Sequence, residues 1–329
     1  IKEKQLKSLL QGSLEISDNI FSAIVPSPKP YHYRNRIDMK LKRVKDGAGV
    51  SVGFTPAQKR GVIPVDACYI AEQSISDFIP ELKRQAAARI TAKHREANLV
   101  VRTGDDGRVF WGGVGRRSCE LPPKDYLWTQ LGGRRIFYSL DTFFQANLSI
   151  LPRLFEELRL WPVWEKKPAF YDLYGGVGLF SVGLCDCARN MVLIEETGAS
   201  AKLAHYNAAY NRIDHLRIIQ GRVEDHLPGL LETQAQETAV AMIDPPRAGL
   251  SADACRFLSG MRQIGHMIYL SCNPEALARD LRQFMDQGWT VERIVPFDFF
   301  PKTRHVETLV LLGQDGGKGG TYATAKDPL

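Results

Sequence analysis

The chain has 329 residues, of which 44% are hydrophobic and 24% charged, a balance that excludes disordered and fibrous proteins. No apolar run approaches the roughly 18 residues of a membrane span, and no stretch resembles a signal peptide. The net charge of +6 is uneven: residues 1–148 carry 24 basic and 15 acidic side chains, residues 149–329 carry 19 and 22. This asymmetry suggests that the basic first half binds a polyanion and that the second half is catalytic, although a solvated basic face explains the charge difference equally well. The six cysteines are irregularly spaced, so we expect reduced thiols in a cytoplasmic protein.

The first half of the chain is predicted to form a mixed α+β domain. A helical lead-in of about twenty residues precedes strand-like, turn-rich segments over 31–70. Apolar residues then recur at helical spacing over 75–90. Because proline lacks a backbone N–H, this helix is expected to begin just before Pro80, with Ser76 or Asp77 as its cap. Further strands are predicted at 97–103, 107–114 and 134–140.

The second half alternates short apolar runs with helical stretches, beginning with a helical stripe over 151–158. Apolar runs without polar alternation are typical of strands buried on both faces, and their alternation with helices predicts a doubly wound, mostly parallel sheet. We expect the domain boundary near 141–150, or near 165–168 if the stripe belongs to the first domain. The predicted strands lie at 169–175, 191–196, 216–221, 240–246 and 267–273.

A glycine-rich turn follows the first of these strands, with Gly175 at its start. Such glycines let the backbone approach a ligand and turn into a helix, although a plain tight turn would look the same. Glu195 ends the next strand, where a carboxylate can accept hydrogen bonds from ribose hydroxyls. The spacing is not that of a dinucleotide motif, and Asp172 just before the turn favours S-adenosylmethionine as the cofactor.

Three later residues stand where strands of the predicted sheet end or begin. Asp244 is followed by two prolines, which fix an extended backbone, so it is either a site residue or part of a stiff strand exit. Cys272 ends the fifth strand, where a thiolate nucleophile would face the ligand crevice and a lone cysteine would otherwise be packing. Glu307 opens an apolar strand, where a carboxylate is either functional or simply solvated.

These segments together resemble the motifs of the RNA 5-methyluridine methyltransferase family. The matching motifs are DLYGGVG, LIEE, IDPPR, LSCNP and DFFPKTRHVETLVLL, in that order, and residues 143–147 match the family's FFQ-x-N segment. The resemblance spans about residues 1–312. It implies a Rossmann-like, S-adenosylmethionine-dependent methyltransferase domain at 141–313, preceded by a smaller α+β RNA-binding domain at 1–140 and followed by a disordered tail at 314–329.

The resemblance also implies a mechanism for methylating carbon 5 of a uridine in RNA. Cys272 would add to carbon 6 of uracil and so activate carbon 5, and Glu307 would remove the proton from carbon 5 after methyl transfer. Asp244 would lie near the uracil and the transferred methyl group. The cofactor contacts implied in this way are Gln145, Tyr174, Gly175, Glu195 and Asp244.

An RNA uridine must be unstacked or flipped to reach such a crevice, and the basic first half is the expected grip on the RNA backbone. We expect ribosomal RNA slightly ahead of transfer RNA as the substrate, a monomeric protein and no membrane association. The expected RNA contacts are Arg34, Arg36, Lys40, Lys42 and Arg43, which alternate with Tyr31, Tyr33 and Met39.

Two positions depart from the family pattern, and one metal-binding motif is incomplete. Leu179 replaces a common Asn or Gly in the glycine turn, and Arg222 replaces the Asp or Asn that usually contacts adenine. Some relatives bind a four-iron cluster through three N-terminal cysteines and a fourth that Cys68 matches. No cysteine precedes Cys68 here, so we expect no metal site, and an iron–sulfur cluster only if N-terminal cysteines exist in the full-length protein.

Two other functions remain open from the sequence. A methyltransferase acting on DNA or on a base amino group would accommodate the Asp-Pro-Pro motif but would leave Cys272 and Glu307 without roles. A catalytically silent RNA-binding protein could keep the same fold, because fold does not imply activity.

Overall fold

The computed structural model describes residues 1–44, 49–57, 61–90, 95–115, 118–232 and 239–314. It divides into two compact units: a larger one of Ile1–Ser27 and Leu151–Leu329, and a smaller one of Pro28–Ile150. Apart from Gln314, the predicted disordered tail lies outside the described residues. Among the described residues, no helix is both long and apolar enough to cross a membrane.

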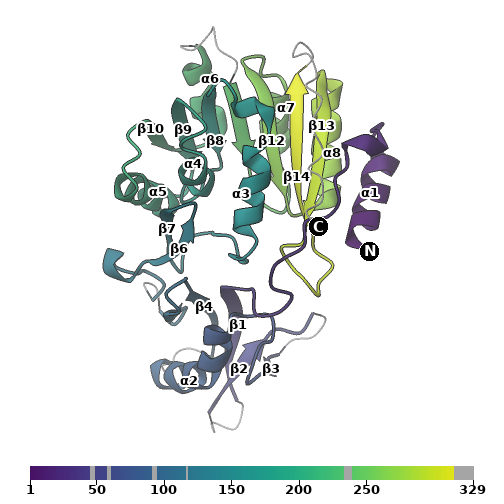
Figure 1. Ribbon diagram of the computed structural model, residues 1–329. Coiled ribbons are helices and arrows are strands. Elements are labelled where there is room, and N and C mark those ends of the chain that lie inside the picture. The colour runs from purple at the N-terminus through teal and green to yellow at the C-terminus, as the bar shows by residue number, and fades with distance from the viewer. Residues whose placement is uncertain (45–48, 58–60, 91–94, 116–117, 233–238, 315–329) are drawn as a thin grey trace. The chain divides into compact units, whose positions relative to one another are not determined.

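The larger unit is built on a seven-stranded sheet in the order β10-β9-β8-β11-β12-β14-β13 (Figure 1). The first five of these pair in parallel, and only β14 runs antiparallel to its neighbours. The predicted doubly wound, mostly parallel sheet is therefore confirmed. The strands are β8 (Ala169–Leu173), β9 (Asn190–Glu195), β10 (Leu216–Gln220), β11 (Ala239–Ile243), β12 (Ile264–Ser271), β13 (Trp289–Phe297) and β14 (Glu307–Gln314).

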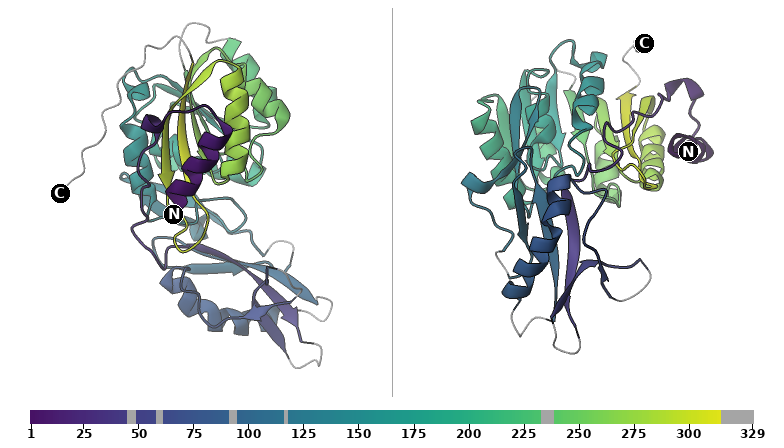
Figure 2. Two further views of the ribbon diagram at one scale, coloured as in Figure 1. Left: turned by 90° about the vertical axis from the view of Figure 1, so that its right-hand side faces the viewer. Right: turned by 60° about the horizontal axis from the view of Figure 1, so that its bottom comes forward.

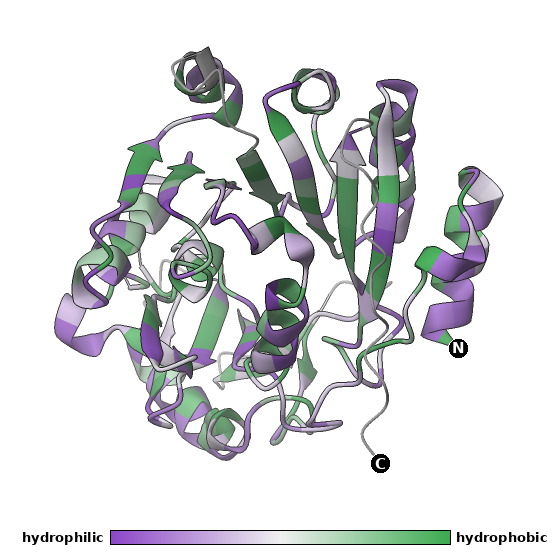
Figure 3. Cartoon of the chain, turned by 45° about the horizontal axis from the view of Figure 1, so that its top comes forward, coloured by the Kyte–Doolittle hydropathy of each residue, from purple (hydrophilic) through white to green (hydrophobic). Residues whose placement is uncertain are grey.

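Helices cover both faces of this sheet, so its central strands are buried on both sides and are mostly hydrophobic (Figure 3). One face packs against α6, α7 and α8 in a single apolar cluster. On the other face, Trp164 contacts Phe170 of β8, and Phe155 of α3 stacks on Phe180 of α4. The helices of this unit after residue 150 are α3 (Leu151–Arg159), η3 (Pro162–Trp164), α4 (Leu179–Gly183), α5 (Gly198–Tyr210), α6 (Val223–Glu232), α7 (Ala252–Ser259) and α8 (Pro274–Asp286).

The first 27 residues belong to the larger unit, which differs from the predicted domain of residues 1–140. Helix α1 (Lys2–Ser13) lies beside α8 (Figure 2). It buries Leu6 and Leu10 in the apolar cluster that includes α8. After η1 (Asp18–Ile20), the chain forms parallel bridges from Phe21 and Val25 to β13. An apolar helix stripe needs a partner surface, and here α8 supplies it.

The smaller unit contains a five-stranded antiparallel sheet in the order β3-β2-β1-β4-β5, with α2 (Gln73–Arg89) packed on its apolar face. A separate hairpin of β6 and β7 follows. This is the mixed α+β unit predicted from the sequence. Its other elements are β1 (Arg36–Arg43), β2 (Val50–Phe54), β3 (Ile63–Pro64), β4 (Glu96–Thr103), β5 (Val109–Gly112), η2 (Pro123–Asp125), β6 (Leu127–Leu131) and β7 (Arg134–Tyr138).

The predicted start of the helix in this unit was wrong. Helix α2 begins at Gln73, with Glu72 as its N-cap, and Pro80 lies inside it. An interior proline costs about 3 kcal/mol relative to alanine. Ile75 lies one turn before the proline, and Ile79 directly precedes it. Both side chains are fully buried against the sheet, and their burial offsets the cost of the interior proline.

Candidate active site

Cys272 lies in a short turn between β12 and α8 that is fixed by several hydrogen bonds. The Ser271 hydroxyl donates to the Asn273 carbonyl (3.2 Å), and the Asn273 side chain caps α8 by accepting from the Glu275 N–H (3.2 Å). The Asn273 side-chain amide also donates to the Arg247 carbonyl (3.0 Å), which joins this turn to the one after β11. The thiol is thus held at the carboxyl end of a parallel strand, where ligands bind in such sheets.

Glu307 is brought beside Cys272 by the antiparallel pairing of β12 and β14. The register pairs Ser271 with Thr308. In an antiparallel pair the next position on one strand lies opposite the previous position on the other, so Cys272 lies opposite Glu307. Asp244 follows β11, the neighbour of β12 on its other side. The sheet therefore brings together the three residues predicted to be catalytic.

The electrostatics of this group are dominated by burial. Glu307 is only 4% exposed, and burial together with the charge of Asp244 raises its pKa well above the usual value. Burial, then the charges of Glu307 and Asp244, raises the pKa of the Cys272 thiol to about 11. Arg247 acts in the opposite direction on both groups.

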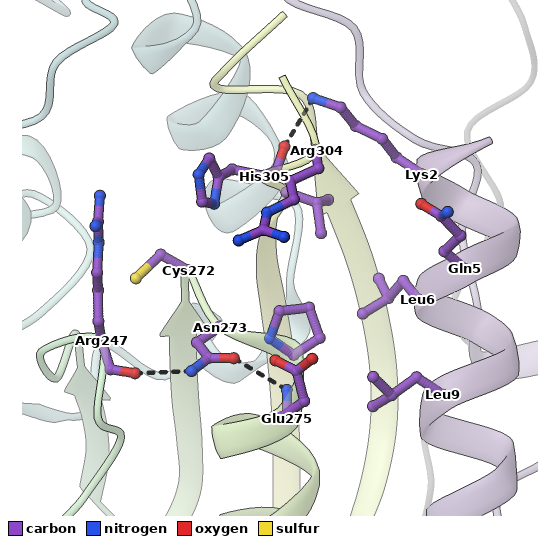
Figure 4. A pocket seen from close by; sticks show the side chains of 12 residues that line it. Lys2, Gln5, Leu6, Leu9, Arg247, Cys272, Asn273, Glu275, Arg304 and His305 are labelled. Carbon is purple, nitrogen blue, oxygen red and sulfur yellow. Dashed lines mark hydrogen bonds between the residues drawn. The ribbon is translucent and has the colours of Figure 1, made fainter. Parts of the chain in front are cut away.

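A cavity of about 530 Å³ opens beside Cys272 (Figure 4). The sulfur faces Arg247 on one side of the cavity, and α1 forms the opposite wall through Gln5, Leu6 and Leu9. Arg304 and His305, from the segment that leads into β14, line it as well. The nucleophile candidate is therefore accessible from a pocket rich in hydrogen-bond donors.

The glycine turn after β8 packs closely against β9. A Cβ atom at Gly175 would lie 2.5 Å from the Leu193 side chain, so only glycine fits there. Tyr174 has a φ of 61°, a strained conformation for a tyrosine that is typical of ligand-binding turns. The Glu195 carboxylate accepts hydrogen bonds from the Gly176 N–H (3.0 Å) and the Thr197 N–H (2.7 Å). Each of its oxygens keeps a further lone pair for a ligand hydroxyl.

Asp172 supports this turn from below. It is 1% exposed and accepts hydrogen bonds from the backbone N–H (2.9 Å) and the hydroxyl (2.6 Å) of Ser181. Burial raises the pKa of its carboxyl to about 7. Its position is that of a support for the turn, since a buried side chain of this kind has no open path to a ligand.

A second cavity, of about 450 Å³, lies at the carboxyl ends of the neighbouring parallel strands. Tyr174, Glu196 and Arg222 line it together with Pro245. Its size, its apolar walls and the nearby Glu195 fit a nucleoside. Arg222 forms an ion pair with Glu224 (3.5 Å) at the edge of this cavity, so adenine there would meet a guanidinium in place of the usual acceptor.

Gln145, the remaining predicted cofactor contact, lies buried in the smaller unit. The segment before it is held by Arg102, which is fully buried and had no signal in the sequence. Its guanidinium donates to the carbonyls of Ser139 and Thr142 (both 2.8 Å) and of Phe144 (3.1 Å). Burial lowers the pKa of Arg102 to about 10, so it stays charged at neutral pH.

The residues predicted to bind RNA lie on or next to β1. The apolar residues of this strand face α2, and Met39 and Tyr33 are buried, so neither is available for stacking on bases. Arg36 pairs with Asp38 (2.9 Å) and Lys40 with Glu96 (3.1 Å). Arg34, Lys42 and Arg43 complete the predicted set; Lys42 is exposed, and Arg43 donates to the Ile90 carbonyl (3.3 Å).

Cys68, the residue that matches the fourth cluster ligand of some relatives, lies just before α2 in the smaller unit. It is buried among the apolar residues packed around α2, and its N–H donates to the Ser76 hydroxyl (3.0 Å). Across the described parts of the chain, no three His, Cys, Asp or Glu residues gather in a way that could hold a metal ion.

A pair of residues on α8 also shapes the site and was missed in the sequence. Asp280, 1% exposed, accepts from the Leu250 N–H (2.9 Å) and the Tyr269 hydroxyl (2.7 Å). Arg279 donates to the carbonyls of Ala248 (3.0 Å) and Leu250 (3.1 Å). Together they fix the turn after β11 that carries Asp244. An Arg-Asp pair on a helix usually indicates a solvated surface, so there was no reason to select it from the sequence.

Comparisons with known proteins agree with the motifs. A family model described as tRNA (uracil-5-)-methyltransferase matches residues 123–315. An uncharacterised RNA methyltransferase of Caldanaerobacter subterraneus subsp. tengcongensis is 33% identical, over 95% of this chain and 79% of that protein. The tRNA (uracil(54)-C(5))-methyltransferase of Schizosaccharomyces pombe is 28% identical, over 94% of this chain and 60% of its own length.

The fold is also found in a solved structure. The crystal structure of the Pyrococcus abyssi tRNA (uracil-54, C5)-methyltransferase, in complex with S-adenosyl-L-homocysteine, superposes with a TM-score of 0.70 at 22% sequence identity. The match covers 94% of this chain and 81% of that one. It extends the agreement in fold beyond the residues that the family model matches.

Proposed function

The chain belongs to the tRNA (uracil-5-)-methyltransferase family, a family of RNA-modifying enzymes, and we propose that it methylates carbon 5 of a uridine in RNA with S-adenosylmethionine as methyl donor. The observation that carries this proposal is the β12–β14 register, which sets Cys272 beside Glu307 at the ligand end of the sheet. A nucleophile and a base at one position are what addition to carbon 6 and proton removal from carbon 5 require.

Cys272 forms the first bond in the proposed reaction. Its thiolate adds to carbon 6 of uracil, and the electron pair of the C5–C6 double bond moves toward the carbonyl at carbon 4 to give an enolate. Carbon 5 of this enolate is the nucleophile. S-adenosylmethionine, when bound, would supply the electrophilic methyl group to carbon 5, with cleavage of its S–CH3 bond and release of S-adenosylhomocysteine.

Glu307 completes the reaction by taking the proton from carbon 5. The electron pair of that C–H bond restores the enolate, and elimination then breaks the bond between carbon 6 and Cys272. A raised pKa makes the Glu307 carboxylate a stronger base than an exposed glutamate. Arg247 supplies positive charge beside the thiolate, which favours its formation.

The cofactor is proposed to occupy the second cavity and the glycine turn. Glu195 would accept hydrogen bonds from the ribose hydroxyls through its remaining lone pairs. Tyr174 and Gly175 would shape the approach to the methionine part. Asp244, which directly follows β11 and precedes Pro245 of the cavity wall, and Gln145 are further proposed contacts. Arg222 would stack on adenine or donate to its ring nitrogens.

The smaller unit is proposed to bind the RNA backbone through the basic residues on β1. The two relatives named for uridine 54 act on transfer RNA, which supports transfer RNA beside the ribosomal RNA favoured from the sequence. All six cysteines are free thiols, which supports a reducing, cytoplasmic location.

The test is to incubate the protein with ribosomal or transfer RNA and S-adenosylmethionine carrying a deuterated methyl group, and to analyse the nucleosides by mass spectrometry. We expect labelled 5-methyluridine from the wild type and from the control Cys187→Ala, and none from Cys272→Ala. Methylation on a base amino group that survives Cys272→Ala would indicate the amino-group enzyme. RNA binding without any labelled nucleoside would indicate a silent RNA-binding protein.

A further inference from the structure

Glu307 lies at the loop end of the hairpin formed by β13 and β14, so its position depends on the conformation of that loop. Strands β13 and β14 are joined by residues 298–306, here called the β13–β14 loop, and the pair nearest the loop is Phe297 with Glu307. Any spreading of the loop therefore acts first on the pair that contains the proposed base. The loop also contributes Arg304 and His305 to the cavity beside Cys272.

Lys2 of α1 bonds both sides of this loop. Its ammonium donates to the Asp298 carboxylate (2.6 Å) and the Phe300 carbonyl (2.8 Å) on the side of β13. It donates a third hydrogen bond to the His305 carbonyl (2.7 Å) on the side of β14 (Figure 4). A lysine has three N–H donors, and all three are used here to join the two sides of the loop.

The helix that carries Lys2 is itself fixed to the larger unit. Leu6 and Leu10 are buried in the apolar cluster that includes α8, and the Glu3 carboxylate accepts a hydrogen bond from the Ile24 N–H (2.9 Å). The side chain of Lys2 is only 15% exposed. A lysine on a fixed helix, with most of its side chain covered, holds its partners more firmly than a surface lysine does.

We propose that Lys2 is a positioning residue for the methyl transfer, which holds the β13–β14 loop so that Glu307 stays aligned beside Cys272. This inference rests on the function proposed above. Lys2 acts through Glu307 and does not itself touch the reacting atoms. The N-terminal helix is in this way part of the catalytic apparatus, although it precedes the methyltransferase motifs by more than a hundred residues.

The proposal predicts which step should fail when the loop is released. Cys272 is held independently, through Ser271 and through the bond from Asn273 to Arg247. Addition of the thiolate to carbon 6 and methyl transfer should therefore continue, whereas proton removal by a misaligned Glu307 should slow. The methylated RNA then stays bonded to Cys272 because elimination follows proton removal.

The experiment compares Lys2→Met with Lys4→Met on the same helix. Methionine keeps the length of the side chain but cannot donate, and Lys4 is exposed, so its variant is the matched control. Two quantities are measured with unmodified RNA: kcat for 5-methyluridine formation, and the fraction of protein bonded to RNA on a denaturing gel. For Lys2→Met we expect kcat to fall about 10- to 100-fold, the bonded fraction to rise and the KM for RNA to stay within about twofold.

Two further variants act on the same contacts. Asp298→Asn keeps an acceptor oxygen but removes the charge, and it leaves α1 unchanged, so it should give a smaller change in the same direction. Lys2→Arg keeps the charge and the donors and should restore part of kcat. The thermal denaturation midpoint of every variant is also measured, to detect any loss of overall stability.

The outcomes separate this proposal from the one on which it rests. If the wild type forms no 5-methyluridine, the proposed function is wrong. If the wild type is active and Lys2→Met matches Lys4→Met, the positioning role is wrong. A fall in kcat without accumulation of bonded RNA would also overturn the positioning role, because general destabilisation of the protein has that effect. So would a rise in the KM for RNA with kcat unchanged, because loss of an RNA contact has that effect.

Discussion

The carboxyl end of the large sheet and the outer face of β1 both hold ionisable residues, but they hold them in different environments. Cys272 and Glu307 lie beside one another in surroundings that raise the pKa of each. On β1, Arg36 and Lys40 lie nearer to water, and each is paired with a carboxylate of its own sheet. The carboxyl end of the large sheet shifts the pKa values of a few buried groups strongly, whereas the outer face of β1 carries several charges that each interact weakly.

This difference determines how much one residue can matter. A reaction centre depends on the protonation state and the alignment of single groups, so one substitution should remove most of the rate. A polyanion is bound by the sum of several screened charges, so one substitution should change affinity only a little.

The largest effect is expected from Glu307→Gln. Glutamine has nearly the same shape but cannot accept the proton from carbon 5, so the rate of 5-methyluridine formation should fall about 10²- to 10⁴-fold. RNA bonded to Cys272 should accumulate, as measured on a denaturing gel. A variant with close to wild-type turnover would show that another group is the base.

A smaller effect is expected on the reactivity of the Cys272 thiol in the free protein. With a pKa of about 11, roughly one thiol in a thousand is ionised at pH 8, and the rate of alkylation should rise about tenfold per pH unit between pH 8 and 10. The rate is measured by mass spectrometry of the Cys272 peptide after timed treatment with iodoacetamide. A plateau below pH 9 would contradict the raised pKa.

The neighbours of Cys272 should change this rate in opposite directions. Glu307→Gln removes a negative charge, lowers the pKa of the thiol and should speed alkylation at pH 8. Arg247→Ala removes a positive charge, raises that pKa and should slow alkylation about two- to fivefold, whereas Arg256→Ala on α7 should leave it unchanged.

The smallest effects are expected on β1. Lys42→Ala should weaken RNA binding by less than about tenfold and leave kcat unchanged at saturating RNA. Glu96→Gln, which releases Lys40 from its ion pair, should strengthen RNA binding by about twofold. Both are measured as equilibrium affinities over a range of salt concentrations. A loss of kcat in either variant would mean that this face contributes to the chemistry.

The architecture of the larger unit could be predicted because its secondary structure is encoded in local sequence patterns. Apolar runs separated by helical stretches identified the parallel strands, and strand ends identified Cys272, Asp244 and the glycine turn. Glu307 could be selected as a carboxylate at the start of an apolar strand, but its position beside Cys272 could not be predicted, since it depends on β14 lying between β12 and β13. That insertion is a property of the assembled sheet.

Other features depended on tertiary contacts that a single sequence does not reveal. Pro80 argued for a later helix start, but burial of Ile75 and Ile79 outweighed the cost of the proline. The first 27 residues were assigned to the domain of residues 1–140 because they precede it in the chain, and the sequence does not show that α8 covers their apolar side chains. Nothing in the sequence distinguishes Lys2 from the other lysines of α1, whereas the structure places three hydrogen-bond acceptors around it.

The most direct test of the central claim is to mix the protein with S-adenosylmethionine and RNA containing 5-fluorouridine. Fluorine cannot leave carbon 5 as a proton does, so the reaction should stop with the RNA bonded to the protein. We predict a stable complex on a denaturing gel, peptide mass spectrometry that places the bond on Cys272, and no complex with Cys272→Ala. A complex that persists in Cys272→Ala, or its absence with RNA that the protein methylates, would contradict the proposed mechanism.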